Sequence, residues 1–300
     1  MLSAQTFIAV RDYDLAATLN SGQVFRWTWR AGGWEGVVGP RWVRLQPRRE
    51  GIAAQTAAPI SDWSWLTCYL QTGIDFDAVR RSFPKDEPMR ASLAACRGLR
   101  LLRQDPWECL ASFIISSTKQ IVQIRQIVAL LCRQWGEPVA VPAGHESAFA
   151  FPTAGRLAAA TEAQLRACKM GFRAPYLLAA ARRVAEGEID LPGLQAKPVD
   201  DAREALLQIP GVGDKIANCV LLFAYGFQEA FPVDVWIRKA LRQLYFPRRN
   251  PPPRTLARFV ATHFGPNAGY AQQYLFHYMR TKQRGATIPS CLCEVALPVN

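Results

Sequence analysis

The stretch Leu206-Leu-Gln-Ile-Pro-Gly-Val-Gly-Asp-Lys215, followed by Pro232-Val-Asp234, decides the fold. A helical pattern over Asp201–Leu207 precedes the Pro210-Gly-Val-Gly213 turn, and another over Lys215–Tyr225 follows it. Glycines in the turn permit positive φ and let a bulky partner approach the backbone. The amides that begin the second helix have no intrahelical acceptor and can hold an anion. The stretch therefore predicts two helices joined by an anion-binding hairpin.

The chain is strongly basic, which narrows the classes of partner. Its 300 residues carry 36 lysines and arginines against 24 acidic residues, so the formal net charge is +12. An excess of this size favours an acidic partner, and nucleic acid fits better than a small metabolite. Half of the residues are hydrophobic, which is enough for two or three domains with cores of their own.

Two ionisable residues stand out beside the hairpin. Lys215 opens the second helix, and Asp234 introduces a third. A lysine at a helix start is usually a solvated charge, and an aspartate before a helix is usually only an N-cap. Pro-Gly-x-Gly between helices is also ordinary turn chemistry. The conjunction of hairpin, lysine and acid-capped helix in this order favours a nucleophile and a carboxylate next to a nucleic-acid backbone clamp.

Hydrophobic periodicity predicts an α+β fold that is mostly α. Short apolar–polar alternations up to about residue 60 indicate a small antiparallel sheet. From Trp63 to the end the period is helical, with an Asp105-Pro106 N-cap and a helix over Ile121–Trp135. We predict three parts, the last two forming a two-lobed helical body: 1–90, an N-terminal antiparallel β domain with short helices; 91–190, a helical lobe; 191–300, a helix-hairpin-helix catalytic lobe with the C-terminal helices.

The distribution of cysteines and the length of the apolar segments indicate the cellular compartment of the protein. Eight cysteines are scattered, mostly within apolar helical patterns, which indicates reduced core residues. Cys291-x-Cys293 is the only close pair and has no second pair or histidine beside it, so we expect no zinc site there. We expect no signal peptide and no membrane span. The expected location is cytoplasmic, on the nucleoid in a bacterium, or nuclear in a eukaryote.

The hairpin with its lysine and acid resembles the helix-hairpin-helix (HhH-GPD) DNA glycosylase superfamily, and the rest of the chain resembles its 8-oxoguanine DNA glycosylase branch. Ser21-Gly-Gln-Val-Phe-Arg-Trp27 is similar to the N-terminal signature of that branch. Gln104-Asp-Pro-Trp-Glu-Cys-Leu110 and Gly171-Phe-Arg-Ala-Pro-Tyr176 are similar to later blocks, and Ala271-Gln272 with Leu275-Phe276 match the end of its pocket. The matches run in the family's order along nearly the whole chain.

The resemblance implies a bifunctional base-excision repair enzyme. It would flip 8-oxoguanine out of double-stranded DNA, excise it through a lysine imine and cleave the strand by β-elimination, acting as a monomer. Lys215 would attack C1′ of the sugar, which requires the neutral amine. Asp234 would stabilise the cationic sugar, and its helix N-terminus is expected to help keep it ionised. No cofactor is required and no iron–sulfur cluster is expected.

The resemblance also implies a base pocket. Gly22 would present its carbonyl to the N7–H that 8-oxoguanine has and guanine lacks. Cys219 and Phe276 would sandwich the base, and Gln272 would read its Watson–Crick edge. Each has an ordinary interpretation as a core residue, because Cys219 and Phe276 lie at helical spacing in apolar surroundings.

Further DNA contacts follow from the resemblance. Phe172 would act as a wedge in the base stack, and Arg173 would read the orphaned cytosine. The remaining implied contacts come from the hairpin and from one loop: Gly211, Gly213, Ile216, Thr118, Lys119 and Gln120. A structural cation would bind the backbone carbonyls of Leu207, Ile209 and Val212.

The chain departs from the family at the residues that normally read the opposite base. Family members usually have three asparagines in place of Thr118-Lys119-Gln120 and an arginine in place of Gln123. The loss of these residues predicts a weaker preference for cytosine. Separately, Trp236 replaces a histidine that is common two positions after the catalytic acid. Two alternatives remain open: an alkyl-purine glycosylase of the same fold, against which Lys215 argues, and a non-catalytic DNA-binding protein, in which Asp234 and the pocket residues would have no role.

Overall fold

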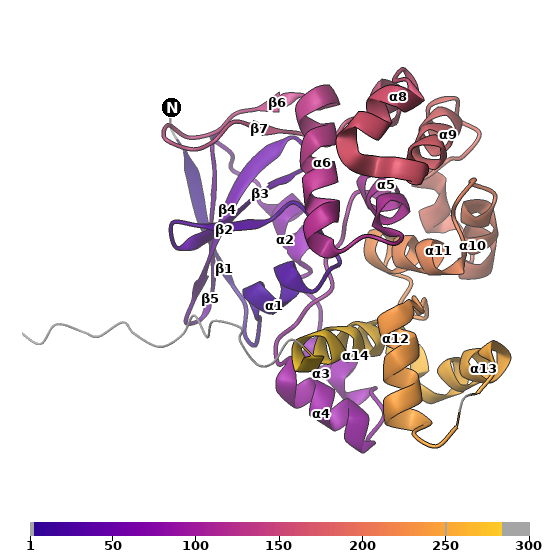
Figure 1. Cartoon of the computed structure of the whole chain (residues 1–300). Coiled ribbons are helices and arrows are strands. Elements are labelled where there is room, and N and C mark those ends of the chain that lie inside the picture. The colour runs from indigo at the N-terminus through magenta and orange to yellow at the C-terminus, as the bar shows by residue number, and fades with distance from the viewer. Residues whose placement is uncertain (1–2, 250, 284–300) are drawn as a thin grey trace, which may run out of the picture.

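The N-terminal part of the chain forms a β-sheet (Figure 1). The computed structural model describes residues 3–249 and 251–283. Five antiparallel strands form the sheet in the order β1-β5-β4-β3-β2. Ile8 pairs with Ile52 and Leu45 with Ala54, so apolar side chains share one face. The strands are β1 (Ala4–Ala9), β2 (Thr28–Arg30), β3 (Gly33–Val38), β4 (Arg41–Arg48) and β5 (Gly51–Thr56).

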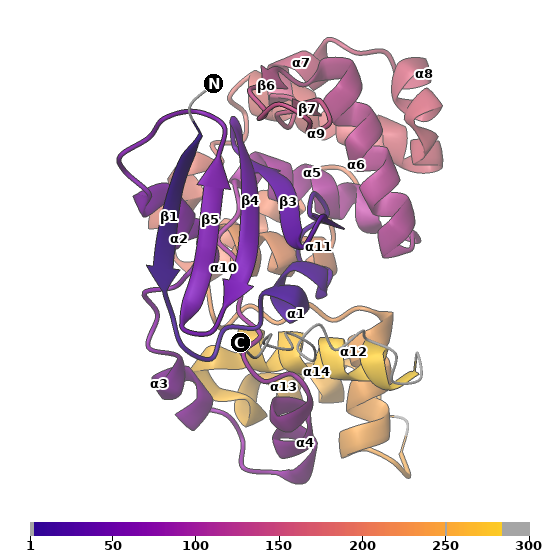
Figure 2. The ribbon, with the colours of Figure 1, turned by 90° about the vertical axis from the view of Figure 1, so that its left-hand side faces the viewer.

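The sheet has its own hydrophobic core. The helices α1 (Leu15–Asn20) and α2 (Ser64–Leu70) contribute Leu19 and Leu66 to it, both fully buried. Trp27 fills its centre, and the indole N–H donates to the Tyr69 hydroxyl over 2.8 Å. Figure 2 looks onto the outer face of the sheet, with α2 and the helical body behind it. The predicted antiparallel sheet is thus confirmed.

The helical body divides into two groups in Figure 1. One lies beside the sheet, and the other lies below it and joins α3 and α4 to the C-terminal helices. The first group contains α5 (Pro106–Ser116), α6 (Ile121–Trp135), α7 (Ala154–Ala158), α8 (Glu162–Leu165), α9 (Ala174–Ala185), α10 (Val199–Leu207) and α11 (Asp214–Val220). The second contains α3 (Phe76–Arg81), α4 (Glu87–Ala95), α12 (Val235–Ala240), α13 (Pro253–His263) and α14 (Ala268–Gln283).

Several helix boundaries follow the sequence signals. The predicted helix Ile121–Trp135 has those bounds, and Asp105 caps α5 by accepting a hydrogen bond from the Glu108 amide over 2.8 Å. The helix predicted over Lys215–Tyr225 starts one residue earlier and finishes in a π-helical turn, Leu221–Tyr225. The α+β, mostly helical fold class is confirmed.

One expectation about the chain after Trp63 was wrong. The helical period was expected to continue from Trp63 to the end, but β6 (Pro138–Val139) and β7 (Ala148–Phe149) form a small antiparallel hairpin after α6. Strands of two residues are too short to show a period of two.

The segment just before residue 96 packs against the C-terminal helices. Asp86 accepts a hydrogen bond from the Tyr245 hydroxyl over 3.3 Å and lies 2.6 Å from Nε2 of His263. The rings of Phe83 and Tyr274 meet edge to face at 5.8 Å. The division at residues 90 and 190 stays a prediction, and the part beyond residue 283 lies outside the described residues.

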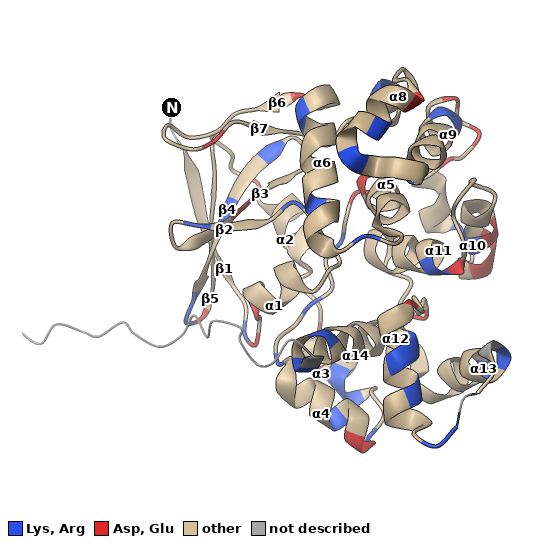
Figure 3. Ribbon diagram, in the orientation of Figure 1, with Lys and Arg blue, Asp and Glu red and all other residues tan. Residues whose placement is uncertain are grey.

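Charged residues are unevenly distributed along the helices (Figure 3). α10 carries Asp200 and Asp201 in its first turn, whereas α12 carries Arg238 and Lys239 in its last.

Of the helices that the structure describes, none combines the length and apolar character needed to span a membrane.

Candidate active site

The predicted hairpin is present between α10 and α11. Gly211 has a φ of 81°, and a Cβ there would lie 2.6 Å from the ring of Tyr176, so conformation and packing both require glycine. Gly213 is the exposed N-cap of α11 and places Lys215 in the first turn. Amides at this point have no intrahelical acceptor.

A cavity of about 320 Å³ lies where α5, α11, α12 and α14 meet. Its wall brings together most of the predicted chemistry from distant parts of the sequence: Gly22, Lys119, Gln120, Lys215, Cys219, Asp234, Gln272 and Phe276. It also includes residues to which the sequence assigned no role: Phe25, Phe113, Ser116 and Arg280.

Lys215 reaches from α11 to the end of α5. Its Nζ donates to Oγ of Ser116 over 2.9 Å and lies 5.1 Å from the centre of the Phe113 ring. Phe113 and Ser116 are three residues apart and therefore share a helix face. Sequence reasoning missed both, because the spacing defines the face but not the partner that it meets.

Asp234 caps α12. Its Oδ1 accepts a hydrogen bond from the Ile237 amide over 2.8 Å. Burial raises the pKa of this carboxyl, although the hydrogen bond from Ile237 and the charges of Lys215 and Arg280 act in the opposite direction. The hydrogen bond at the helix N-terminus favours the ionised form, as expected, but burial has the larger effect on the pKa of this carboxyl.

Hydrogen bonds from two parts of the chain hold the loop that carries Gly22. The side chain of Gln23 donates to the Arg100 carbonyl over 2.8 Å and accepts from the Leu102 amide over 2.8 Å. From α14, Gln273 donates to the Ser21 carbonyl over 3.0 Å. The loop therefore has one position relative to α14, the helix that supplies the opposite side of the pocket.

The remaining pocket residues differ in their polar character. The Oε1 atom of Gln272 is buried and accepts no hydrogen bond from the part of the chain that the structure describes, so its capacity to accept one is unsatisfied. Burial raises the pKa of the Cys219 thiol to about 12, so this side chain is a neutral, polarisable surface. The guanidinium of Arg280 lies 5.4 Å from the centre of the Phe276 ring. The wall thus combines apolar faces with one unsatisfied acceptor.

We expect Gly22→Ala to slow base excision at least tenfold. Gly22 has a φ of 83°, and a Cβ would lie 2.9 Å from Cδ1 of Ile121 and 3.3 Å from the Phe276 ring, inside the cavity. Positive φ alone costs a non-glycine residue about 1–3 kcal/mol. Gly32→Ala is the matched control, since Gly32 has a φ of 76° with nothing within 4 Å of an added Cβ. Equal single-turnover excision rates for both variants would contradict a role for the Gly22 position.

Several predicted DNA contacts lie outside the cavity wall. Phe172 is 51% exposed, and the Arg173 guanidinium lies 4.9 Å from its ring centre. Arg173 also donates to the Gly211 carbonyl over 3.4 Å, which links this pair to the hairpin. Thr118 is exposed with a φ of 64°, whereas the side chain of Ile216 is buried, so only the backbone of Ile216 could reach DNA.

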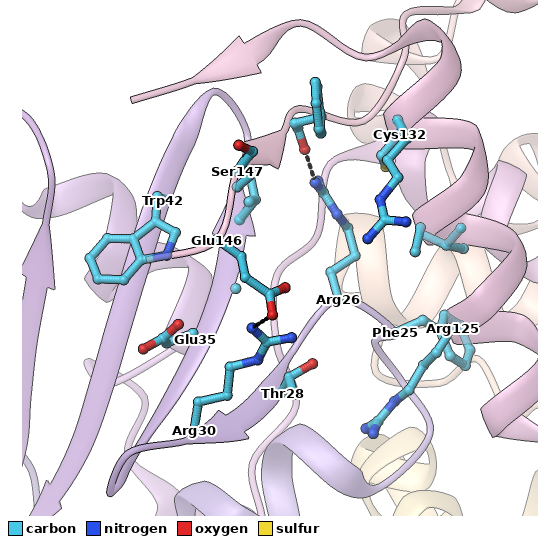
Figure 4. A pocket seen from close by; sticks show the side chains of 17 residues that line it. Phe25, Arg26, Thr28, Arg30, Glu35, Trp42, Arg125, Cys132, Glu146 and Ser147 are labelled. Carbon is cyan, nitrogen blue, oxygen red and sulfur yellow. Dashed lines mark hydrogen bonds and ion pairs between the residues drawn. The ribbon is translucent and has the colours of Figure 1, made fainter. Parts of the chain in front are cut away.

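A second cavity of about 230 Å³ lies between the sheet, α6 and the β6–β7 hairpin (Figure 4). Four arginines line it, and three of them contact other side chains of the protein. Arg26 pairs with Glu108 at 3.3 Å and Arg30 with Glu146 at 2.6 Å. Arg125 donates to the side chain of Asn20 over 3.0 Å, just before the Gly22 loop. The contacts around this cavity therefore hold the sheet against the helical body.

Metal-binding groups are a separate question. Within residues 3–249 and 251–283, no three His, Cys, Asp or Glu side chains are grouped as a metal site requires. The Cys291-x-Cys293 pair lies outside these residues. Of the three hairpin carbonyls expected to hold a cation, that of Ile209 already accepts a hydrogen bond from the Val212 amide over 3.0 Å.

Comparisons with known proteins agree with this arrangement. Residues 6–110 match the family described as 8-oxoguanine DNA glycosylase, N-terminal domain, and residues 111–264 match the HhH-GPD superfamily base excision DNA repair proteins. The probable N-glycosylase/DNA lyase of Methanothermobacter thermautotrophicus is 33% identical over 91% of this chain and 95% of its own.

Solved structures give the same result. The 8-oxoguanine glycosylase/lyase of Clostridium acetobutylicum, in complex with double-stranded DNA containing cytosine opposite 8-oxoguanine, has a TM-score of 0.85 and 28% identity. That similarity covers 93% of this chain and 98% of the other. The structure of MBOgg1 with a low-affinity DNA ligand has a TM-score of 0.87 and 32% identity, covering 93% and 96%. The chain therefore belongs to the HhH-GPD superfamily of base excision DNA repair proteins and carries the N-terminal domain of 8-oxoguanine DNA glycosylases.

Proposed function

We propose that the protein is a bifunctional 8-oxoguanine DNA glycosylase/lyase. The observation that carries this proposal is that one cavity wall contains the amine of Lys215 and the buried carboxyl of Asp234. The same wall contains the expected base-binding residues, Gly22, Cys219, Gln272 and Phe276. A non-catalytic DNA clamp has no use for such a cavity. An alkyl-purine glycosylase has no need of an amine in its wall.

The chemistry would start with the flipped nucleotide in the cavity. The neutral amine of Lys215 forms a bond to C1′ as the C1′–N9 bond breaks, and the base leaves with the electron pair and takes up a proton. The carboxylate of Asp234 stabilises the positive charge that develops on the sugar. The bonded nitrogen then loses a proton, and its electron pair forms the imine as the C1′–O4′ bond breaks and O4′ takes up a proton. The protonated imine acidifies the C2′ protons, so that loss of one of them expels the 3′ phosphate by β-elimination.

Recognition of the base would use the walls of the same cavity. The ring of Phe276 and the thiol of Cys219 provide the two faces, and the unpaired Oε1 of Gln272 accepts a hydrogen bond from the Watson–Crick edge. The Gly22 carbonyl would accept the N7–H of 8-oxoguanine, a proton that guanine lacks. A guanine N7 in that place would put two acceptors in contact, which costs free energy.

Contacts to the DNA duplex would lie around the cavity. The amides at Gly211, Gly213 and Ile216 would bind a backbone phosphate, and Phe172 with Arg173 would enter the base stack. The cation expected on the carbonyls of Leu207, Ile209 and Val212 stays a prediction, as do a monomeric state and a location on the nucleoid or in the nucleus.

Borohydride trapping tests the proposed function directly. An imine between the protein and C1′ is reduced to a stable amine, so the protein should become covalently linked to DNA that contains 8-oxoguanine and should also cut the strand. An alkyl-purine glycosylase would release a methylated base without an adduct. A DNA clamp would bind the duplex and do neither.

We expect the preference for cytosine opposite the lesion to be weaker than is usual in this family. The side chain of Gln123, which replaces the family's arginine, accepts a hydrogen bond from the Gln120 amide over 2.9 Å and so caps α6. Loss of a charged donor pair removes on the order of 1–3 kcal/mol of discrimination. Single-turnover cleavage of four duplexes that differ only in the opposite base measures it. A thousandfold faster reaction opposite cytosine than opposite every other base would contradict this expectation.

A further inference from the structure

The amine of Lys215 must be oriented toward C1′ as well as placed in the cavity. A lysine side chain has four rotatable carbon–carbon bonds and many rotamers, so an amine in a cavity of this size samples positions far from any one carbon atom. Displacement of a reacting atom by about 1 Å can slow a reaction a hundredfold. Whatever fixes Nζ of Lys215 therefore influences the rate of attack.

Ser116 is the hydrogen-bond acceptor that holds Nζ. Its own hydroxyl donates to the Phe113 carbonyl over 2.7 Å, so its proton is engaged and its lone pairs face away from α5. One of them receives an N–H of Lys215 over 2.9 Å. This hydrogen bond fixes Nζ at the wall of the cavity that Lys215 lines.

The anchor beneath Ser116 is rigid. The Phe113 ring stacks on Phe223 at 5.5 Å with 15° between the planes, and it meets Phe25 edge to face at 5.8 Å. Phe113 is only 4% exposed. The last turn of α5 therefore offers the amine a fixed acceptor and a fixed aromatic face.

The chemical nature of the acceptor also matters. Asp234 lines the same cavity, but no ion pair within 4.0 Å joins it to Lys215 among the residues that the structure describes. A carboxylate acceptor would stabilise the charged ammonium, which cannot attack carbon. A neutral hydroxyl orients the nitrogen with much less of that penalty and leaves Asp234 to face the sugar.

We propose that Ser116 is a positioning residue that aims the amine of Lys215 at C1′ of the flipped nucleotide. The inference rests on the proposed function, in which Lys215 is the nucleophile. It assigns to Ser116 an effect on the rate of imine formation and no part in binding DNA.

The test compares Ser116→Ala, Ser116→Thr and Ser117→Ala with the unmodified full chain. Ser117 is the matched control, because it is the next residue and its hydroxyl forms no hydrogen bond in the described part of the chain. The measurements are the single-turnover rate of borohydride-trapped adduct formation on 8-oxoguanine DNA, the dissociation constant for that DNA, and the melting temperature.

We expect Ser116→Ala to slow adduct formation between about tenfold and a hundredfold, with the dissociation constant changed less than twofold. Ser116→Thr, which keeps the hydroxyl, should recover most of the rate, and Ser117→Ala should match the unmodified protein. The inference is overturned if Ser116→Ala reacts at the unmodified rate, if threonine does not restore it, or if Ser117→Ala is equally slow. An unmodified protein that forms no adduct would instead overturn the proposed function.

Discussion

Lys215→Gln should abolish both the adduct and strand cleavage, lowering the rate at least about a thousandfold. The glutamine amide nitrogen has no lone pair available for attack on C1′. Its N–H can still donate toward Ser116, which accepts from Lys215 over 2.9 Å, so the packing of α5 on α11 should survive. Affinity for 8-oxoguanine DNA should therefore change little.

A variant of Lys119 tests whether Lys215 or Lys119 is the nucleophile. It is the second lysine in the cavity wall and lies in the loop that was predicted to contact DNA. Lys119→Gln keeps Lys215 and should still form the covalent adduct. If Lys215→Gln is trapped on DNA and Lys119→Gln is not, Lys119 is the nucleophile, and the assignment made from the hairpin is wrong.

The sequence predicted those parts of the site that depend on local chemistry. Gly211 could be identified because a turn between helices needs positive φ, which the structure has at 81°. Asp234 could be identified as an N-cap, and its side chain does accept from the Ile237 amide. Each property is set by residues within a few positions of the one concerned, so a pattern can reveal it.

Properties that depend on the tertiary arrangement could not be predicted in this way. Ser116 and Arg280 reach the cavity because α5 and α14 happen to meet α11 and α12 there, and the sequence contains no signal for that meeting. The raised pKa of Asp234 comes from burial by distant segments. The side chain of Gln123 looked like a lost DNA contact, and the structure adds that it caps its own helix.

Asp234→Asn should lower turnover by about a hundredfold to a thousandfold while leaving DNA affinity nearly unchanged. Asparagine caps helices as well as aspartate does and can accept the same hydrogen bond from Ile237, so stability should be kept. Asp105→Asn is the matched control: Asp105 caps α5 with the same 2.8 Å geometry but is not part of the cavity wall. A melting temperature that fell together with activity only in Asp234→Asn would favour a purely structural role.

The pH dependence of the unmodified protein tests the same assignment independently. Burial raises the pKa of Asp234, so this carboxyl takes up its proton at a higher pH than an ordinary aspartate does. Only the ionised form can stabilise a cationic sugar. The excision rate should therefore decline as the pH falls through that raised pKa, and the contribution of Asp234 to the rate should be fully present above it. Asp234→Asn has no proton to gain there, and its low residual rate should lose this acidic limb. An acidic limb that persists unchanged in the variant would show that a different group, such as the amine of Lys215, sets the acidic limb, and the pH dependence would then give no support to the role of Asp234.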